Sequence, residues 1–359
     1  MYLKHIKLRN FKNFTEADFE FSPKLNAMVG PNGIGKTNLL DAVHYLALTK
    51  SYLNYSDVQN IKFEEDFFTL EGAFVKEQNE DVIFCSVQKE RGKIFKRNSK
   101  VYDKLADHIG VYPLVMISPY DLDLIKEGSE VRRKFIDNII SQSDKEYLSK
   151  LIRYNRVLSQ RNSLLKYFSL NQVFDGNSLE IYNAELIPLG NFIHRKRMEL
   201  IEEFVPVFKD YYRLISNDSE SVAISYESAL KHDAYDTLLN DSLQADRAAQ
   251  YTTKGIHKDD FEFKIAAYPV KKFGSQGQQK SFLISLKLAQ LELIKKKLEI
   301  TPLLLLDDIF DKLDEHRVEQ LIQLVNEDRF GQIFISDTHP DRTVGILKRI
   351  NSGSKIFEL

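Results

Sequence analysis

The chain has 359 residues, 43% of them apolar, and a formal net charge of -2. This length and composition predict a globular protein with a sizeable core. The near-neutral charge excludes nucleic-acid binding by overall basicity, so a DNA surface must be a local patch. Cys85 is the only cysteine, which excludes an internal disulfide or a thiolate metal site. No apolar run reaches the roughly 18 residues that cross a bilayer, so we expect a cytoplasmic protein without a membrane partner.

The N-terminal third alternates apolar and polar residues, as half-buried strands do. One helix interrupts it, where apolar residues recur at helical spacing over 37–49. A turn is expected at Asn98 and Ser99. The predicted strands cover 1–8, 14–21, 24–29, the alternating stretch 67–101, and the apolar run 112–117.

Beyond residue 128 the pattern becomes helical and stays so to about residue 216, with a loop at 171–178. Strand-like alternation returns afterwards, followed by an amphipathic helix over 278–297. The later predicted strands are 222–226, 261–268, 303–306 and 332–336. We therefore predict an α/β fold in which residues 1–127 and 217–359 form a head domain and residues 128–216 form an inserted helical lobe.

The strongest motif is a glycine-rich loop between a predicted strand and a predicted helix. Its glycines let backbone N–H groups point at phosphate oxygens, and the following helix adds its positive end. Lys36 is expected to reach the β- and γ-phosphates, and the Thr37 hydroxyl to ligate Mg²⁺. The predicted ATP-binding residues are Gly30, Pro31, Asn32, Gly33, Ile34, Gly35, Lys36, Thr37 and Asn38.

A second motif is the apolar strand that ends in two acids. Asp307 is expected to hold Mg²⁺ together with Thr37, and Asp308 to orient or deprotonate the attacking water. With Lys36 and His339, Asp308 makes up the predicted catalytic set. On its own the pattern also fits a buried strand that ends in solvated acids.

A third motif stands directly before the helix predicted from Lys280. Ser275, Gln276, Gly277 and Gln278 resemble the signature of ABC-type ATPases, which faces the γ-phosphate held by another subunit. A small-molecule kinase has no use for such a loop. After the acid pair, Asp311 and Asp314 resemble a D-loop, and Thr338-His339 matches a switch histidine that senses the γ-phosphate.

These motifs follow one another in the order of an ABC-type ATPase head, a class of P-loop NTPase. About 240 residues separate Lys36 from Ser275, an interval that transporter subunits shorten and chromosome-organising ATPases fill with long coiled coils. Here the interval holds a compact helical lobe without sustained heptads. The two cofactors that the motifs imply are ATP and Mg²⁺.

Further residues complete the pattern, which comprises segments 8–14, 30–38, 118–122, 254–260 and 274–279, with Arg132, Arg133 and the pair Asp307 and Asp308. On these residues, and over essentially its full length, the chain resembles the RecF family of bacterial recombination-mediator ATPases. The resemblance implies an ATP-dependent homodimer that clamps double-stranded DNA near single-strand gaps or junctions, without sequence specificity. It also implies RecR and RecO as partners, recombinase loading, weak DNA-stimulated ATP hydrolysis and association with the nucleoid.

The chain departs from the usual pattern of that family at three positions. Tyr120 stands where relatives usually carry Glu, in the segment analogous to the Q-loop, so we assign it no role at Mg²⁺. Ile256 and Lys258 stand where relatives usually carry Pro and Arg.

Three basic clusters are candidates for DNA contact. Lysines and arginines in such groups grip phosphates and make binding sensitive to salt, but each cluster also fits a solvated surface. The residues predicted to bind DNA are Lys93, Lys96, Arg97 and Lys100 in a hairpin and Arg153 and Arg156 in the helical lobe, and the third cluster is His194 to Arg197.

Other ATPase classes share part of the pattern. The nucleotide-binding subunit of a transporter has a shorter interval between the phosphate loop and the signature. The structural head of a chromosome-organising complex, or of another SMC-like ATPase, has sustained heptads. An ABC-headed nuclease needs an additional acid-rich domain after Leu306, and no such domain is visible in the sequence.

Overall fold

The computed structural model describes residues 1–54, 56–216, 220–309, 315–326, 329–349 and 353–359. The chain forms two compact units, each of which is described by itself. The head unit consists of Met1–Leu122, Tyr211–Asp218 and Lys280–Leu359. The insert unit consists of Asp123–Asp210 and Ser219–Gln279.

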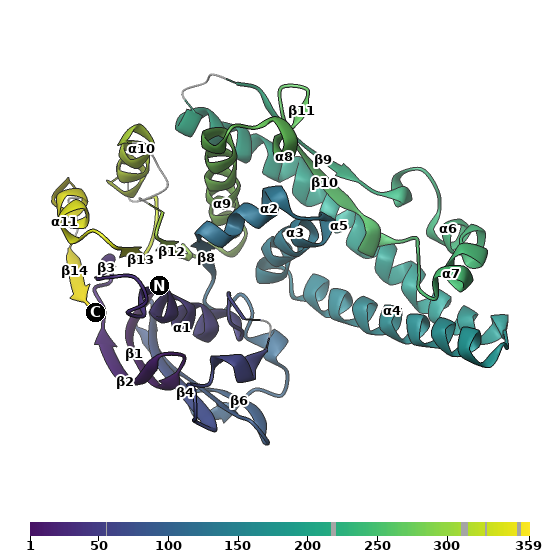
Figure 1. Ribbon diagram of the computed structural model, residues 1–359, viewed down its shortest axis with the longest axis horizontal. Helices are drawn as coiled ribbons and strands as arrows, with labels where there is room; N and C mark the ends of the chain where they lie inside the picture. Colours follow the sequence, from purple (N-terminus) through teal and green to yellow (C-terminus); the bar gives the residue numbers. More distant parts are fainter. Residues whose placement is uncertain (55, 217–219, 310–314, 327–328, 350–352) are drawn as a thin grey trace. The chain divides into compact units, whose positions relative to one another are not determined.

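An antiparallel sheet forms one layer of the head unit (Figure 1). Its long strands β1, β4 and β5 alternate buried side chains with more exposed ones, as the sequence predicted. Asn98 and Ser99, with φ angles of 48° and 68°, make the predicted left-handed turn between β6 and β7. The strand order is β2-β1-β4-β5-β6-β7, with β1 Tyr2–Phe11, β2 Phe14–Glu20, β4 Phe67–Lys76, β5 Asn79–Gln88, β6 Gly92–Arg97 and β7 Lys100–Val101.

A parallel sheet forms the other layer of the head unit. Its central strands are buried along their whole length, which agrees with their unbroken apolar sequences. Parallel strands end at one edge, and ligands of such sheets bind at that edge. The strand order is β14-β3-β13-β12-β8, with β14 Ser354–Glu358, β3 Leu25–Val29, β13 Ile333–Asp337, β12 Leu303–Asp307 and β8 Leu114–Ile117.

Helix α1 (Lys36–Leu48) packs against strands of both sheets, and nearly all of its side chains are buried. Close packing shows at Gly72 on β4, where a Cβ atom would lie 2.7 Å from Leu46 Cδ1 of the helix. A side chain at Gly72 would therefore force the Leu46 side chain of α1 to shift. The helix that follows the glycine-rich loop is thus held rigidly in the core.

Helix α9 (Gln276–Leu298) begins in the insert unit and continues through the head unit. The prediction that this helix is amphipathic is wrong, because every side chain from Ser281 to Leu291 is buried. Polar residues such as Lys287 and Gln290 lie inside and suggested a solvent face in the sequence. The other head helices are α10 (Glu315–Asn326) and α11 (Pro340–Arg349).

The insert unit combines long helices with a sheet (Figure 1). Helix α4 ends with an αL residue at Gln172, and α5 starts four residues later, slightly before the predicted end of the loop. The helices are α2 Asp123–Lys126, α3 Ser129–Ser143, α4 Lys145–Asn171, α5 Gly176–Ser216, α6 Tyr235–Asp241, α7 Leu243–Ala249 and α8 Val270–Phe273. The residues of α5 from Tyr211 onward belong to the head unit. The sheet is β11-β10-β9, with β9 Val222–Glu227, β10 Asp260–Ile265 and β11 Tyr268–Pro269.

Buried charges join the helices of this unit to segment 254–260. Arg197 on α5, 1% exposed, bonds to the Ile256 carbonyl at 2.7 Å and pairs with Asp137 and Asp259 at 2.9 and 3.0 Å. Arg132 on α3 forms a two-pronged pair with Asp260 at 2.7 and 2.9 Å. Segment 254–260 is therefore a structural centre of the insert unit, and Arg197 of the third basic cluster faces inward.

The boundaries of the units differ from the predicted domains between residues 219 and 279. The prediction placed this stretch in the head, whereas it groups with the helices. The physical reason is the network around segment 254–260, together with packing of α3 on β10. In the part of the chain that is described, no helix has the length and apolarity that crossing a membrane requires.

Candidate nucleotide site

The glycine-rich loop follows β3 directly and leads into α1. Gly30, Gly33 and Gly35 have φ angles of 154°, 82° and 124°, which side-chain-bearing residues rarely adopt. The Lys36 ammonium donates to the carbonyls of Gly30 at 2.8 Å and Pro31 at 3.0 Å. The loop thus has the curved backbone of a phosphate cradle, with a lysine held across it.

The turn between β1 and β2 braces this loop. Asn13 Nδ2 donates to the Ile34 carbonyl at 2.8 Å, and Asn38 Nδ2 donates to Asn13 Oδ1 at 2.7 Å. A Cβ at Gly35 would lie 2.6 Å from the Asn13 amide. Sequence reasoning gave Asn13 no role at the site. The sequence feature that could have indicated such a role is the position of Asn13 in the tight turn between two strands.

The Asp307 carboxylate collects hydroxyl groups from three neighbouring elements. Thr37 Oγ1 on α1 and Ser336 Oγ on β13 donate to Oδ1 at 2.8 and 2.7 Å, and Ser118 Oγ after β8 approaches Oδ2 at 3.3 Å. Burial raises the pKa of Asp307 above its ordinary value of 3.8, and these hydrogen bonds offset part of the rise. The predicted metal-binding pair, Thr37 and Asp307, is therefore in direct contact.

The second acid lies beside the first but is held differently. Asp308 has a φ angle of 45°, a left-handed conformation that glycine, asparagine and aspartate adopt more readily than other residues. Its backbone N–H donates to Ser336 Oγ at 3.0 Å, so one serine contacts both acids of the pair. Ser336 and Ser118 were missed as site residues, since only strand register brings them to Asp307.

A buried ion pair supports the segment that carries Ser118. The Lys287 ammonium on α9 lies 2.6 Å from Asp121 and donates to the Met116 carbonyl at 3.0 Å. Asp121 accepts from the Ser118 N–H at 2.8 Å and from the hydroxyl of Tyr52. Asp121 thus links the segment after β8 to α9, and exposed Tyr120 next to it takes no part.

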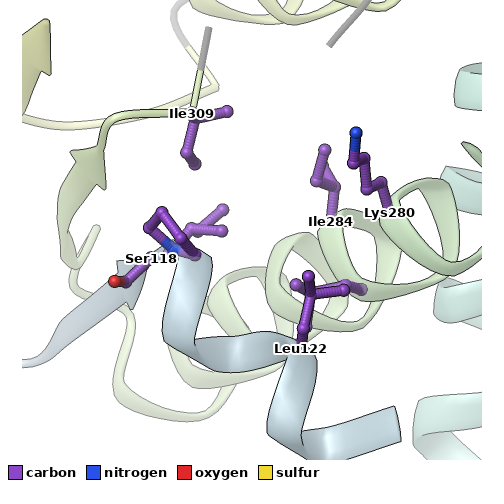
Figure 2. A pocket seen from close by; sticks show the side chains of 8 residues that line it. Ser118, Leu122, Lys280, Ile284 and Ile309 are labelled. Atoms are coloured by element: carbon purple, nitrogen blue, oxygen red, sulfur yellow. The ribbon is translucent and has the colours of Figure 1, made fainter. Parts of the chain in front are cut away.

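An apolar cavity of about 60 Å³ lies beside this segment. Figure 2 shows side chains of the segment after β8 and of α9 around it, with Ile309 above. Its lining is almost entirely carbon, so it does not suit a triphosphate. The lining residues are Ile117, Ser118, Pro119, Leu122, Lys280, Leu283, Ile284 and Ile309.

The predicted switch histidine stands at the end of β13. Asp337 there is buried and binds Arg342 and Thr343 of α11, and it accepts the His339 backbone N–H at 3.1 Å. The His339 residue itself is exposed. The chain therefore passes from the end of β13, beside the acid pair, to an exposed histidine two residues later. The predicted D-loop residues Asp311 and Asp314 lie outside the described residues.

The signature-like loop caps α9 within the insert unit. Ser275 Oγ accepts the Gln278 N–H at 3.2 Å, and Gln278 Oε1 accepts the Ser275 N–H at 2.6 Å. This reciprocal pair is a capping box built with Gln. Ser275 and Gln276 are exposed, and Gly277 is half-buried, so the start of α9 faces solvent as an anion site does.

Comparison with known proteins decides the family. The model for the "RecF/RecN/SMC N terminal domain" matches residues 2–351. "DNA replication and repair protein RecF" of Flavobacterium johnsoniae is 54% identical over all of both chains. The protein so named from Phocaeicola vulgatus is 48% identical over 99% of this chain and 96% of its own. The chain belongs to the RecF family.

Solved structures agree with this membership. "The recombination mediator protein RecF-ATPrS in RecFOR pathway" matches with a TM-score of 0.88 at 30% identity, over 100% of this chain and 96% of that one. The Smc head domain of Pyrococcus furiosus matches with a TM-score of 0.54 at 18% identity, over 96% and 91%. This RecF-family chain therefore has the predicted α/β fold of an ABC-type ATPase head.

Two of the hairpin residues predicted to bind DNA are held by acids. The Lys93 ammonium lies 2.8 Å from Asp57 and donates to the Thr49 carbonyl at 2.7 Å. Arg97 pairs with Asp81 at 2.8 Å. The sequence indicated that these two side chains are partly buried. Lys93 and Arg97 lie two positions before and after buried Phe95, so they share its face of the strand.

The remaining four predicted DNA contacts are more open. Arg153 pairs with Glu185, and Lys96 lies over the ring of Phe84 at 5.7 Å. Lys100 and Arg156 are exposed, and neither is within ion-pair distance of a carboxylate in the described part of the chain. Lys100 and Arg156 are the members of the predicted set best able to meet a phosphate.

Proposed function

We propose that this RecF-family chain is an ATP-switched clamp on double-stranded DNA, in which two copies close around two nucleotides. The observation that carries the proposal is the convergence of Thr37, Ser118 and Ser336 on Asp307 beside the glycine loop. It builds half of a nucleotide site in one copy. The exposed Ser275 loop supplies the other half to a second copy.

Nucleotide binding begins at the glycine loop. Backbone N–H groups from Gly30 to Thr37 cradle the phosphates, and Asn13 and Asn38 keep the loop in shape. The Lys36 ammonium leaves the carbonyls of Gly30 and Pro31 and moves to the β- and γ-phosphates. The lysine is already at the loop, so little reordering is required.

The oxygen donors beside the loop fit Mg²⁺. Thr37 and Asp307 would hold the ion, since hydroxyl and carboxylate oxygens suit a small hard cation. When bound, Mg²⁺ neutralises phosphate charge. Ser118 and Ser336 orient the Asp307 carboxylate. Asp308 orients the attacking water, and His339 senses the γ-phosphate.

Closure follows from the γ-phosphate. In the closed dimer the Ser275 hydroxyl, the side chains of Gln276 and Gln278 and the Gly277 N–H meet the γ-phosphate bound by the other copy. Asp311 and Asp314 belong to the same seam. Hydrolysis removes the γ-phosphate that holds the copies together, so slow, DNA-stimulated ATP turnover opens the clamp.

The partners of the clamp follow from family membership. We infer that it binds DNA without sequence specificity near gaps or junctions, and that the RecO and RecR mediators join it there to load recombinase. A similar solved structure is that of a "recombination mediator protein" in the "RecFOR pathway", which supports this inference. A clamp on DNA would act in the cytoplasm, at the nucleoid.

Two variants test the clamp. Lys36→Ala should lose ATP binding, whereas Ser275→Arg should keep ATP binding and block dimerisation, because its side chain would occupy the place of the γ-phosphate. Light scattering with ATP, ADP or no nucleotide measures dimer formation, and DNA binding is followed in parallel across a salt series. ATP-independent DNA binding by a monomer would contradict the proposal.

A second candidate is the head of another SMC-like complex. The family model that matches this chain also covers SMC proteins, and the Smc head shares the fold. Such a head would need long coiled-coil partners to hold DNA. Nucleotide-dependent DNA binding by the purified chain alone favours the clamp.

A further inference from the structure

An exposed apolar patch lies on the insert unit next to the signature loop. Tyr268 on β11 and Phe273 on α8 are 59% and 64% exposed, and their ring centroids are 5.2 Å apart. Ala266, Ala267 and Pro269 beside them are also exposed. Aromatic side chains grouped in solvent mark a contact surface more often than an idle one.

The turn at this patch has unusual chemistry. Ile265 pairs with Tyr268, so Ala266 and Ala267 alone make the hairpin loop. Such two-residue loops favour Asn, Asp and Gly, which tolerate positive φ and solvate the turn. Ala266 has a φ angle of 51° despite its Cβ. The loop therefore has an apolar tip at a position where Asn, Asp or Gly would adopt the backbone conformation more easily.

The patch is joined rigidly to the signature loop. The Gly274 N–H donates to the Val270 carbonyl at 3.0 Å, and Gln279 Nε2 donates to the carbonyl of Gly274 at 3.0 Å. Val270 is fully buried, which fixes α8 to the unit. Phe273 is two residues from Ser275 in the sequence. A surface that contacts Ser275 therefore lies close to the patch as well.

We propose that this aromatic patch, formed by Tyr268 and Phe273 with Lys271 and Lys272, contacts a second copy of this chain around that copy's ATP-loaded glycine loop. The inference rests on the proposed function, which brings Ser275 to that loop. The glycine loop exposes Pro31 and Ile34, the latter 39% exposed, as apolar partners for the rings.

Charge supports the same occupant. Lys271 and Lys272 are exposed beside the rings, and a bound triphosphate brings several negative charges to the opposite surface. The positive charge of the patch therefore becomes complementary to the second copy when ATP is bound. Lysines with aromatic rings also suit a nucleic-acid strand, and that occupant is one outcome of the test below.

The test compares the wild type with variants of the patch, of a control surface and of the signature. The Tyr268→Gln, Phe273→Gln double variant removes the rings, Leu170→Gln removes an apolar side chain of the same unit that is 81% exposed, and Ser275→Arg blocks the signature. Affinity for a fluorescent ATP analogue is titrated at a protein concentration where the chain is monomeric. Sedimentation velocity with ATP gives the dimer dissociation constant.

The double variant should keep wild-type ATP affinity and raise the dimer dissociation constant at least about tenfold. Leu170→Gln should dimerise normally. Lys271→Glu, Lys272→Glu provides a second route if loss of the rings impairs folding: dimerisation should weaken about tenfold at low salt and recover partly at high salt.

Wild-type dimerisation by the ring variant and the lysine variant, with Ser275→Arg still monomeric, overturns the patch and leaves the clamp standing. Wild-type dimerisation by Ser275→Arg contradicts the clamp itself. A ring variant that dimerises normally but loses DNA affinity tenfold assigns the patch to nucleic acid and also overturns the inference.

Discussion

The hydroxyl of Thr37 and the carboxylate of Asp307, 270 positions apart in the chain, share a hydrogen bond of 2.8 Å. Thr37 lies in the first turn of α1 and Asp307 ends β12, so the bond depends on the packing of α1 against the sheets. The same two oxygen groups suit Mg²⁺. In the free protein the hydrogen bond therefore keeps the two proposed ligands of the ion in place.

Thr37→Val removes the hydroxyl while keeping the shape of the side chain, and Thr37→Ser keeps the hydroxyl. We expect Thr37→Val to weaken Mg²⁺-dependent ATP binding at least about tenfold, because the metal has one ligand fewer and buried Asp307 has one donor fewer. Thr37→Ser should stay near wild type. Titration of a fluorescent ATP analogue with and without Mg²⁺ measures the difference. Equal Mg²⁺ dependence in both variants would remove Thr37 from the metal site.

The Asp121–Lys287 pair makes a prediction about stability. Both side chains are only 6% exposed, so Lys287→Met leaves a buried carboxylate without its cation. We expect the free energy of unfolding to fall by about 3–5 kcal/mol. Part of that stability should return in Lys287→Met, Asp121→Asn, which removes the charge. Urea denaturation monitored by circular dichroism measures both.

A matched surface pair provides the control for that experiment. Lys89 and Asp66 are 3.0 Å apart in the same unit, but their side chains are 46% and 88% exposed. Lys89→Met should change the free energy of unfolding by less than about 1 kcal/mol. A similar destabilisation in Lys89→Met and Lys287→Met would show that burial of the pair has no special weight.

Exposure separates the basic residues that can bind DNA. Replacing Lys100 and Arg156 with Ala should weaken DNA binding and lower the slope of log affinity against log salt by about 1 for each phosphate that the variant no longer neutralises. Lys93→Ala should instead destabilise the hairpin, because Asp57 is left without its cation, and should leave the salt slope unchanged. Fluorescence anisotropy with a DNA duplex in ATP, over a salt series, measures the slopes. A reduced slope in Lys93→Ala alone would reverse the assignment.

The sequence predicted the parts of the site whose chemistry lies in consecutive residues. Gly30 to Thr37 and the acids after β12 are such patterns, because a phosphate cradle needs adjacent N–H groups. Ser118 and Ser336 are single serines at strand ends, and only the order β13-β12-β8 brings them to Asp307. The same limit hid Asn13, whose partner Ile34 lies 21 positions away.

The secondary structure, too, could be predicted where it depends on local sequence patterns and not where it depends on contacts between remote residues. Strands β2, β3, β9 and β12 and helix α1 were predicted close to their observed bounds, because their periodicity is local. The alternating stretch 67–101 contains four strands, although a turn was expected only at Asn98 and Ser99. The mistake over α9 came from buried polar residues such as Lys287, whose partner Asp121 is remote in sequence. Residues 219–279 were assigned to the head because strand patterns there resembled it, whereas the buried Arg197 bonds decide the grouping.

Buried histidines predict how stability depends on pH. Burial lowers the pKa of His108 and of His257 from the ordinary 6.5 to about 4. In each ring, Nε2 donates to a backbone carbonyl, of Leu46 or Thr252, and Nδ1 accepts from a tyrosine hydroxyl. The neutral ring therefore satisfies both bonds.

The sign of the effect follows from which state takes up the proton. The unfolded chain protonates these histidines as pH falls below about 6.5, while the folded chain resists until about 4. Their contribution to stability is thus complete above pH 6.5 and is lost progressively between about 6.5 and 4. The slope should be about 1.4 kcal/mol per pH unit for each histidine that stays neutral.

His108→Gln isolates one of these groups. The variant should be less stable than wild type at pH 7, and the gap should narrow as the pH falls toward 4.5, because the wild type alone then loses the His108 contribution. Urea midpoints at half-unit pH steps give both curves, and carboxylates titrate equally in the two proteins and cancel in the difference. Parallel curves from pH 7 to 4.5 would show that His108 is protonated alike in the folded and unfolded chains. That result would contradict the assignment of His108 as a buried neutral ring that bonds to Leu46 and Tyr102.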